Sequence, residues 1–169
     1  MKAVQNASRE HSLTGALHTL LSSRRTAALG TLDASGAAFV SMVPFATDPA
    51  SASLVIHISA LAGHSQNLRA EPRASLMVAE SEVAGEPVHA LARVSIEVVA
   101  SWAEPGTALA AQCRTVYLAR FPEAEPMTSL GDFRFVRLTP QGARQVAGFG
   151  AARSLSALEL AQTIGQTAR

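Results

Sequence analysis

A short stretch of small and polar residues, ISALAGHSQNL (residues 58–68), follows an apolar run typical of a β-strand. Gly63, His64 and Ser65 come where the strand pattern changes to a helical one, and Asn67 follows shortly after. Backbone N–H groups at a helix start bind anions, and small residues let a phosphate approach them. Ser65 adds a hydroxyl, Asn67 an amide, and His64 an imidazole that becomes cationic beside a dianion. This corner therefore has the chemistry of an anion site; the alternative is a helix start with exposed polar residues.

Two other features are candidates for the same site. Ser41 interrupts the apolar, strand-like run VSMVPF and shares one side of it with Val43 and Phe45. A single serine in a strand usually has its hydroxyl hydrogen-bonded within the protein. Ser41 is therefore a candidate for the anion site only if it lies near the corner. Arg24 and Arg25 stand between a helical pattern and the first strand pattern. An arginine there could reach an anion, and a solvated surface is the alternative.

Several kinds of chemistry have no motif in this sequence. No G-x-S-x-G nucleophile elbow and no phosphate-binding glycine loop is present. Cys113 lies in a helical pattern without a nearby histidine, which favours an inert buried thiol. His11 and His18, like His57 and His64, are seven residues apart, a spacing that matches no metal site. We therefore expect no metal centre, and no catalytic residue follows from the sequence.

Composition narrows the class of protein and its partners. A length of 169 residues fits one domain, and the net charge of +1 without a basic stripe gives no reason to expect a nucleic-acid partner. No apolar stretch is long enough to span a bilayer, so we expect no membrane partner. A single cysteine and the lack of a signal-peptide pattern favour a cytoplasmic protein.

Alternating patterns predict six or seven short strands in hairpin-like succession, with three or four helices around them. We expect an opening helix with Ser8 or Ser12 as N-cap and an apolar face that includes Leu17. The expected strands cover residues 26–32, 37–47, 54–58, 73–80, 89–102, 132–138 and 143–150, the last pairing back across a TPQG turn. The other expected helices lie within residues 60–71, 105–122 and 154–169. Such a succession predicts a mainly β fold, a small antiparallel barrel with peripheral helices.

These segments together resemble a known family. The run H-I-S-x-L-A-x-H-[ST]-x-N-L-x-x-x-P-R-x-S-L at residues 57–76 and a second match at residues 132–152 resemble the pyridoxamine 5'-phosphate oxidase-related, FMN-binding split-barrel proteins. The resemblance is to their haem-utilisation (HugZ-type) branch. It implies a six-stranded antiparallel split β-barrel that works as a homodimer with FMN at the interface. It also implies an N-terminal helix over residues 1–23, a barrel over 24–152 and a helical tail over 153–169.

The resemblance also implies which residues bind the cofactor. Residues on two strands would contact or flank the flavin, the corner would hold its phosphate, and Arg25 is a further candidate. The residues implied are Ser41, Met42, Val43, Ile58, Ser59, His64, Ser65, Asn67, Leu68 and Arg25. Classical members carry basic residues where this chain has Ser41 and Ala46, so we do not expect pyridoxal phosphate synthesis.

Three functions are consistent with the sequence. The first is an FMN-dependent oxidoreductase acting on an unidentified small molecule, in which the flavin supplies the redox step. The second is a haem-binding or haem-degrading protein of the HugZ type. Haem-degrading relatives use a histidine near the C-terminus, but none follows His89 here, so the iron ligand would come from His57, His64, a methionine or a partner chain. Asp132 does lie in a GDF turn of the kind those relatives carry. The third is a non-catalytic flavin-binding or dimerisation module.

Overall fold

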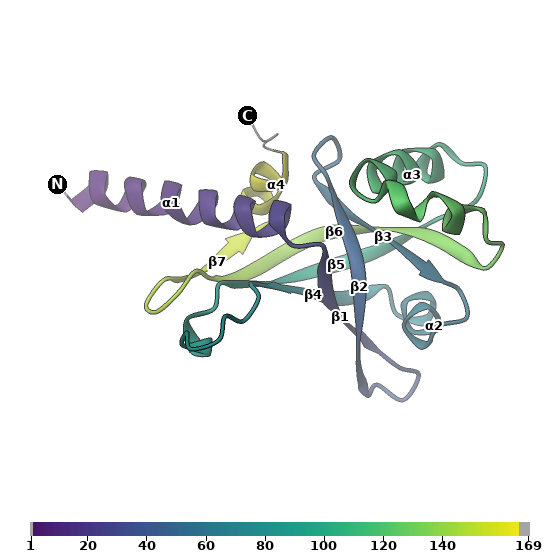
Figure 1. Ribbon diagram of the computed structural model, residues 1–169, viewed down its shortest axis with the longest axis horizontal. Helices are drawn as coiled ribbons and strands as arrows, with labels where there is room; N and C mark the ends of the chain where they lie inside the picture. The colour runs from purple at the N-terminus through teal and green to yellow at the C-terminus, as the bar shows by residue number, and fades with distance from the viewer. Residues whose placement is uncertain (1, 166–169) are drawn as a thin grey trace.

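The structure of this chain, a computed structural model, describes residues 2–165, and the side chains from residue 10 onward. Its strands form one antiparallel sheet in the order β3-β2-β1-β4-β5-β6-β7, and an additional β3–β6 pairing closes the first six into a barrel. Figure 1 shows this barrel at the centre of the molecule with helices around it. The strands are β1 (Thr26–Leu32), β2 (Ala38–Asp48), β3 (Ser53–Ser59), β4 (Arg73–Ala79), β5 (Arg93–Ala103), β6 (Phe133–Val146) and β7 (Ala152–Ser156). The predicted six-stranded antiparallel barrel is confirmed, and β7 is an extra strand.

The barrel interior holds the larger of two hydrophobic clusters. Alternation places apolar side chains inward, as in β5, where Val94, Ile96 and Val98 are buried while Ser95 and Glu97 are exposed. β3 differs, because every residue from 53 to 58 is buried. Its outer face is covered as well, and this is where the second cluster lies, against α3. Such burial on both faces explains why apolar residues predominate in β3.

The helices lie outside the barrel. They are α1 (Lys2–Ser23), α2 (Gly63–Ala70), α3 (Ala108–Arg120) and α4 (Ala157–Gly165), with 3₁₀ segments η1 (Val88–Ala90) and η2 (Pro122–Ser129). Only the second half of α1 packs on the barrel, and the rest projects beyond it (Figure 1). Leu17, the centre of the predicted apolar face, is fully buried. The predicted N-caps Ser8 and Ser12 are wrong, because the helix already begins at Lys2 and both serines lie within it.

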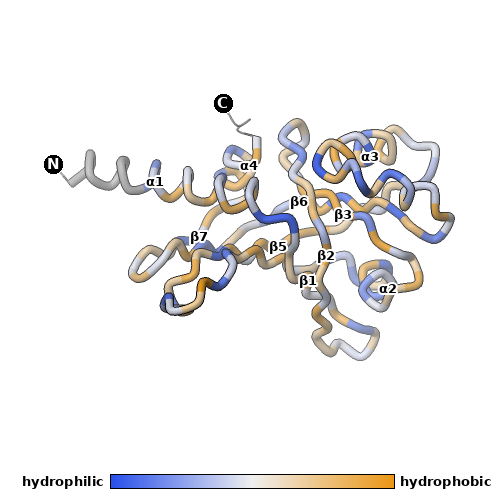
Figure 2. Tube along the Cα trace, in the orientation of Figure 1, coloured by the Kyte–Doolittle hydropathy of each residue, from blue (hydrophilic) through white to orange (hydrophobic). Residues whose placement is uncertain are grey.

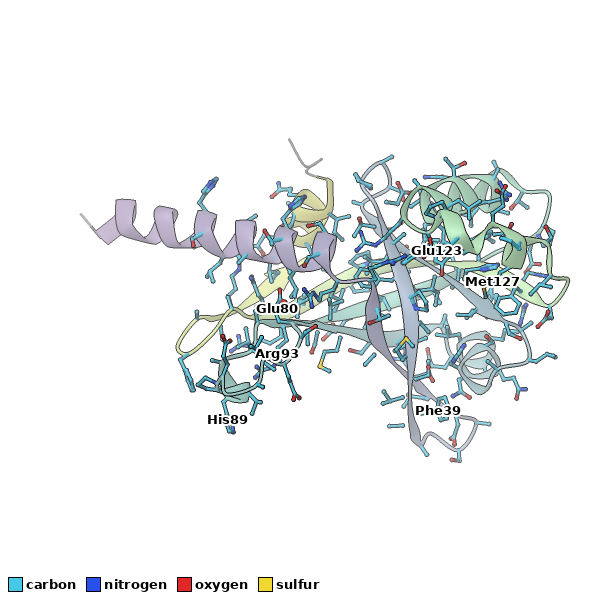
Figure 3. All side chains as sticks on the ribbon, viewed as in Figure 1. Phe39, Glu80, His89, Arg93, Glu123 and Met127 are labelled. Atoms are coloured by element: carbon cyan, nitrogen blue, oxygen red, sulfur yellow. The ribbon has the colours of Figure 1, made fainter. Side chains whose placement is uncertain are left out.

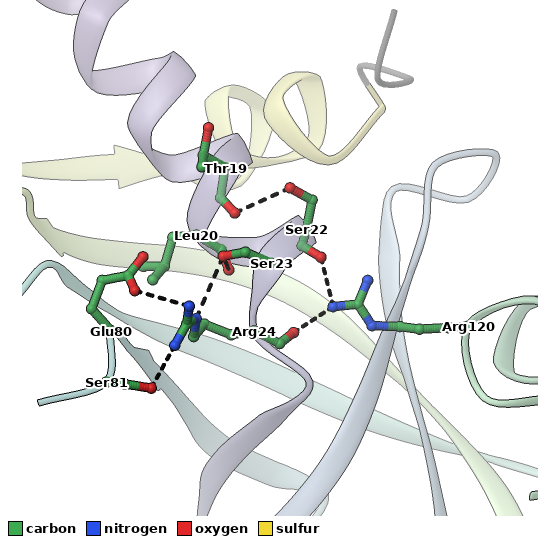
Figure 4. A network of polar contacts seen from close by, with 8 residues as sticks. All are labelled: Thr19, Leu20, Ser22, Ser23, Arg24, Glu80, Ser81 and Arg120. Atoms are coloured by element: carbon green, nitrogen blue, oxygen red, sulfur yellow. Dashed lines mark hydrogen bonds and ion pairs between the residues drawn. The ribbon is translucent and has the colours of Figure 1, made fainter. Parts of the chain in front are cut away.

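Arg120, at the end of α3, fixes the end of α1. Its guanidinium donates hydrogen bonds to the carbonyl groups of Leu21, Ser22 and Arg24, as Figure 4 shows for Ser22 and Arg24. The last carbonyls of a helix lack intrahelical partners and carry negative partial charge, so the half-buried guanidinium of Arg120 is stabilising there. Arg24 itself pairs with Glu80 at 3.2 Å. Figure 2 shows that the connection between α1 and β1 is strongly hydrophilic. Arg25 lies in this connection, directly before β1.

The predicted TPQG turn is wrong. β6 runs without interruption from Phe133 to Val146, and Pro140 pairs with Val98 while Gly142 pairs with Glu97. Gln141 is therefore the extra residue of a β-bulge, which bends the strand without ending it. The C-terminal stretch also differs from the expected helix: residues 152–156 form β7 against β6 before α4 begins. The end of the predicted helix, residues 166–169, lies outside the described residues.

None of the helices within residues 2–165 is long and apolar enough to cross a membrane.

Candidate functional site

A cavity of about 670 Å³ lies on the outer side of the barrel, between β2 and β3 on one side and α3 with η2 on the other. We call it the main cavity. Most of its lining is apolar or aromatic, with a few polar groups at its floor and mouth. The lining residues are Arg25, Thr26, Met42, Val43, Pro44, His57, Ile58, Ser59, Ala62, His64, Tyr117, Phe121, Glu123, Ala124, Met127 and Phe133. Figure 3 shows Glu123 and Met127 together on the α3 side, at the opposite end of the molecule from His89.

The strand-to-helix corner forms one end of this cavity and is held by a small hydrogen-bond network. Ser59 donates its hydroxyl to an Asp132 carboxylate oxygen at 2.7 Å, and the Ala60 N–H donates to the Asp132 carbonyl at 2.7 Å. The Ser65 hydroxyl donates to the Ser59 carbonyl at 2.6 Å. Asp132 thus fixes the end of β3, and Ser65 fixes the first turn of α2 upon it. The first N–H groups of α2, at Gly63 and His64, have no acceptor within the helix.

Six of the ten predicted binding residues line the main cavity together, namely Arg25, Met42, Val43, Ile58, Ser59 and His64.

Three others lie beneath the corner. Ser65 is fully buried. Asn67 donates its amide to the Thr31 hydroxyl at 3.0 Å, and Leu68 is packed in the barrel core. These three side chains are buried under the corner and support it, and they do not line the main cavity.

Ser41 is the one remaining predicted residue, and it does not line the main cavity. Its neighbour across the β1–β2 ladder is Leu29, which is buried in the barrel core. The Ser41 hydroxyl is sealed from solvent and has no hydrogen-bond partner in the described part of the chain. Together with Met42 it borders a smaller cavity of about 370 Å³.

The main cavity contains two histidines whose burial disfavours the charged form. Desolvation lowers the pKa of His57 to about 4 and also lowers the pKa of His64. Both imidazoles are therefore neutral at physiological pH. His57 packs against the rings of Phe133, Phe135 and Tyr117, with centroids 5.1, 4.3 and 5.7 Å away. A neutral imidazole is the form that ligates metals.

An ion pair stands at the mouth of the cavity. The Arg25 guanidinium pairs with the Glu123 carboxylate and lies 4.8 Å from the centre of the Phe121 ring. More than half of each charged side chain is exposed, so water screens the pair and keeps it weak. Burial raises the pKa of Tyr117 to about 12, so its phenol stays protonated. Arg25 is thus the cationic side chain that an anionic ligand group would meet at this mouth.

Sequence reasoning missed the far wall of the cavity. Tyr117 lies in α3 and Phe121 directly follows it, while Phe133 begins β6, so two segments distant from the corner in the sequence supply the aromatic side. From the sequence, His57 is notable only for its spacing to His64 and as one of several possible iron ligands. The signal for it was its place in a buried strand beside Phe135, because a polar residue buried on such a strand needs a reason.

No group of three or more histidine, cysteine or acidic side chains within residues 10–165 is arranged to hold a metal ion. An exposed apolar row does cross the outer face of β2, β1 and β4, where Met42 and Met77 both pair with Ala28. Met42 is 67% exposed and Val40 66%. Exposed apolar patches of this kind mark interaction surfaces.

The chain resembles known haem proteins along most of its length. A family model, described as pyridoxamine 5'-phosphate oxidase, matches residues 13–147. Heme oxygenase HutZ of Vibrio cholerae is 33% identical over 138 residues, 81% of this chain and 77% of HutZ. The crystal structure of HutZ, described as a heme storage protein, superposes with a TM-score of 0.69 at 32% identity, covering 75% of this chain and 89% of that one. A heme binding protein from Mycobacterium smegmatis gives a TM-score of 0.78 at 29% identity, covering 89% of this chain but only 60% of that protein.

Fold and cavity together define a split-barrel protein with a cavity on the outer side of its barrel. The chain belongs to the pyridoxamine 5'-phosphate oxidase family, within the HugZ-type branch that includes HutZ. The resemblance found in the sequence is thereby confirmed.

Proposed function

We propose that the protein binds haem in the main cavity. The observation that carries the proposal is the match, along most of the chain, to proteins described as a heme oxygenase and a heme binding protein. A cavity of about 670 Å³ is in the range of ligand sites of about 300–1,000 Å³. Haem is a large apolar ring with two carboxylates on one edge. Apolar and aromatic walls suit the ring, and Arg25 at the mouth suits a carboxylate.

Haem titration tests this proposal. Ferric haem added to the purified protein should give a Soret band distinct from that of free haem, saturating at one haem per chain. Addition of a reductant and O₂ then tests whether bound haem is degraded, because the relative HutZ is described as a heme oxygenase. An unchanged spectrum of free haem at every ratio would overturn the proposal.

FMN is the second candidate, favoured by the family match and by the six predicted flavin-site residues that line one cavity. Its phosphate would be held by the N–H groups at the start of α2 and by His64. The fit is weaker than for haem, because Ser65 and Asn67 are already engaged in hydrogen bonds within the chain. Haem replaces FMN as the leading ligand for this reason and because the relatives named above are haem proteins.

A visible spectrum separates the two ligands. Flavin bands in the purified protein, lost from the double variant His64→Ala with Ser65→Ala, would favour FMN. If that variant keeps the dissociation constant of FMN, the corner is not the phosphate site. Flavin retained by the wild type in the presence of excess haem would favour the oxidoreductase function over haem binding.

We also propose that the protein is a homodimer whose interface covers the exposed apolar row. Met42 belongs both to that row and to the main cavity, so a partner seated there would border the ligand. Light scattering should give twice the mass of the chain, and Val40→Glu, which places a charge in the row, should give the monomer. A wild-type monomer at micromolar concentration would contradict the proposal. A buried free Cys113 as the sole thiol is consistent with a cytoplasmic location.

A further inference from the structure

His57 is buried without the compensation that buried polar groups normally receive. Only 6% of the residue is exposed, yet it forms no hydrogen bond with any residue that the structure describes. Burial of a polar group costs free energy unless a hydrogen bond or a ligand compensates for it. Nearby polar groups of the corner do have such bonds, as Ser59 and Ser65 show. Nε2 of His64 also lacks a partner, but His57 is the one of the two whose ring nitrogens are not sealed, so it can accept a partner from outside the described residues.

The ring nitrogens of His57 are not fully sealed within the protein. Nε2 of His64 is sealed within the protein, whereas neither nitrogen of His57 is among the sealed, unpartnered atoms of the described residues. His57 lines both the main cavity and a second cavity of about 530 Å³ on the other side of β6 residue Phe133. The ring thus forms part of the wall between two cavities, and a ligand in the main cavity can reach it.

The aromatic side chains around this imidazole hold it in place, and the scarcity of other metal-ligating groups disfavours a bare metal ion. Phe133, Phe135 and Tyr117 surround it and bring no charge. Because the described residues contain no cluster of three metal-ligating side chains, a bare metal ion would find too few ligands here. A metal that arrives with its own equatorial ligands needs only one imidazole more, and porphyrin iron is such a metal.

We propose that His57 is the axial ligand to the iron of haem bound in the main cavity. The inference rests on the proposed haem-binding function and adds the ligand. The neutral imidazole would bind iron through one ring nitrogen and keep its proton on the other; its ring borders both the main cavity and the second cavity. The macrocycle then lies against the wall of β2 and β3, and a haem carboxylate reaches Arg25 at the mouth.

Titrations with two porphyrins separate coordination from simple burial of the ring. Ferric haem and metal-free protoporphyrin IX are each titrated into the wild type, His57→Phe, His57→Gln, His64→Phe and the control His89→Phe, in which an exposed histidine remote from the main cavity is replaced. We expect His57→Phe and His57→Gln to weaken ferric haem by more than about tenfold and to change its Soret band. Affinity for protoporphyrin IX should change less than about threefold, because it has no iron to bind.

The other variants define the remaining outcomes. His89→Phe should match the wild type with both porphyrins. His64→Phe should affect the two porphyrins alike, because His64 lines the cavity without binding iron. Equal affinity of the wild type and both His57 variants for ferric haem would overturn the inference and leave the proposed function intact. Selective loss of ferric haem in His64→Phe would move the ligand to His64 and also overturn it. If the wild type takes up neither porphyrin, the proposed function itself fails.

Circular dichroism checks that the His57 variants fold. Should both unfold, EPR of the ferrous nitrosyl complex of His64→Phe, with and without ¹⁵N-labelled histidine, decides the question. A nitrogen coupling that changes with the label supports His57, since no other histidine then lines the main cavity. A coupling that does not depend on the label would overturn the inference.

Discussion

The two faces of β3 show how one strand serves both stability and binding. On the inner face, Leu54 and Ile56 are fully buried in the barrel core among apolar neighbours. On the outer face, Val55 packs against α3, but His57 and Ser59 are polar and line the main cavity. The inner face presents only apolar side chains, whereas the outer face contains a buried imidazole that has no hydrogen-bond partner among the described residues. Stability should therefore depend on the inner face, and ligand binding on the outer one.

The largest expected effect comes from the inner face. Ile56→Ala should lower the free energy of unfolding by about 3–4 kcal/mol, because it leaves a void in a close-packed core. Urea unfolding measures the loss. The folded fraction should still bind haem with the affinity of the wild type, because Ile56 does not line the main cavity. A strong loss of haem affinity in the folded variant would break the distinction between the faces.

The next effect is a pH dependence that comes from the outer face. The unfolded chain has a histidine pKa of about 6.5 and folded His57 one of about 4, so below pH 6.5 the unfolded state binds more protons. Stability due to the neutral imidazole is complete above pH 6.5 and is lost as the pH falls toward 4. At 1.36 kcal/mol per unit, the loss is about 3 kcal/mol at most.

Comparison with His57→Phe isolates this contribution. Urea unfolding at intervals between pH 7 and 4 should give a shallower dependence in the variant than in the wild type. Some pH dependence of stability should remain in the variant, because burial also lowers the pKa of His64. Identical slopes in the two proteins would show that His57 is not held neutral by burial.

A smaller effect is expected at the corner. Asp132→Ala removes the acceptor of the Ser59 hydroxyl and should cost about 1–2 kcal/mol. The backbone bond from Ala60 to the Asp132 carbonyl remains, so the loss should be local. Hydrogen exchange should show faster exchange at Leu61, whose N–H donates to the Ser59 hydroxyl, than at core amides of β3. Uniform acceleration across β3 would contradict a local role.

The smallest effect is expected at the mouth. Arg25→Gln should weaken haem binding by about 1 kcal/mol or less, because its side chain is more than half exposed. The loss should shrink at high salt, which titrations at two ionic strengths would reveal. The control Arg73→Gln alters another exposed arginine, which lies away from the cavity and should have no effect. A loss of tenfold or more that persists at high salt would place Arg25 in a buried contact.

The sequence predicted the barrel well because strand alternation and turn residues are local signals. Residues 26–32 are predicted and observed as one strand, and the helix near Gly63 follows β3 as expected. Predictions failed where residues typical of one local structure take part in another one in the folded protein. Pro140 and Gly142 resemble a turn, but pairing with β5 makes them a bulge within one strand.

The candidate site was predictable only in part, for a similar reason. The corner and β2 are continuous stretches of the sequence, and the family resemblance of those stretches implied Met42, Ser59 and His64. The aromatic wall of Tyr117, Phe121 and Phe133 comes from a helix and a strand far along the chain. Only closure of the barrel through the β3–β6 pairing brings Phe133 beside His57. No local pattern encodes that contact.

The most direct test of haem binding in the main cavity is a crystal structure of the protein with one equivalent of ferric haem per chain. We expect the porphyrin between β2–β3 and α3, with its iron bonded to the imidazole of His57. Haem located anywhere else, or FMN in the main cavity while haem is excluded, would contradict it.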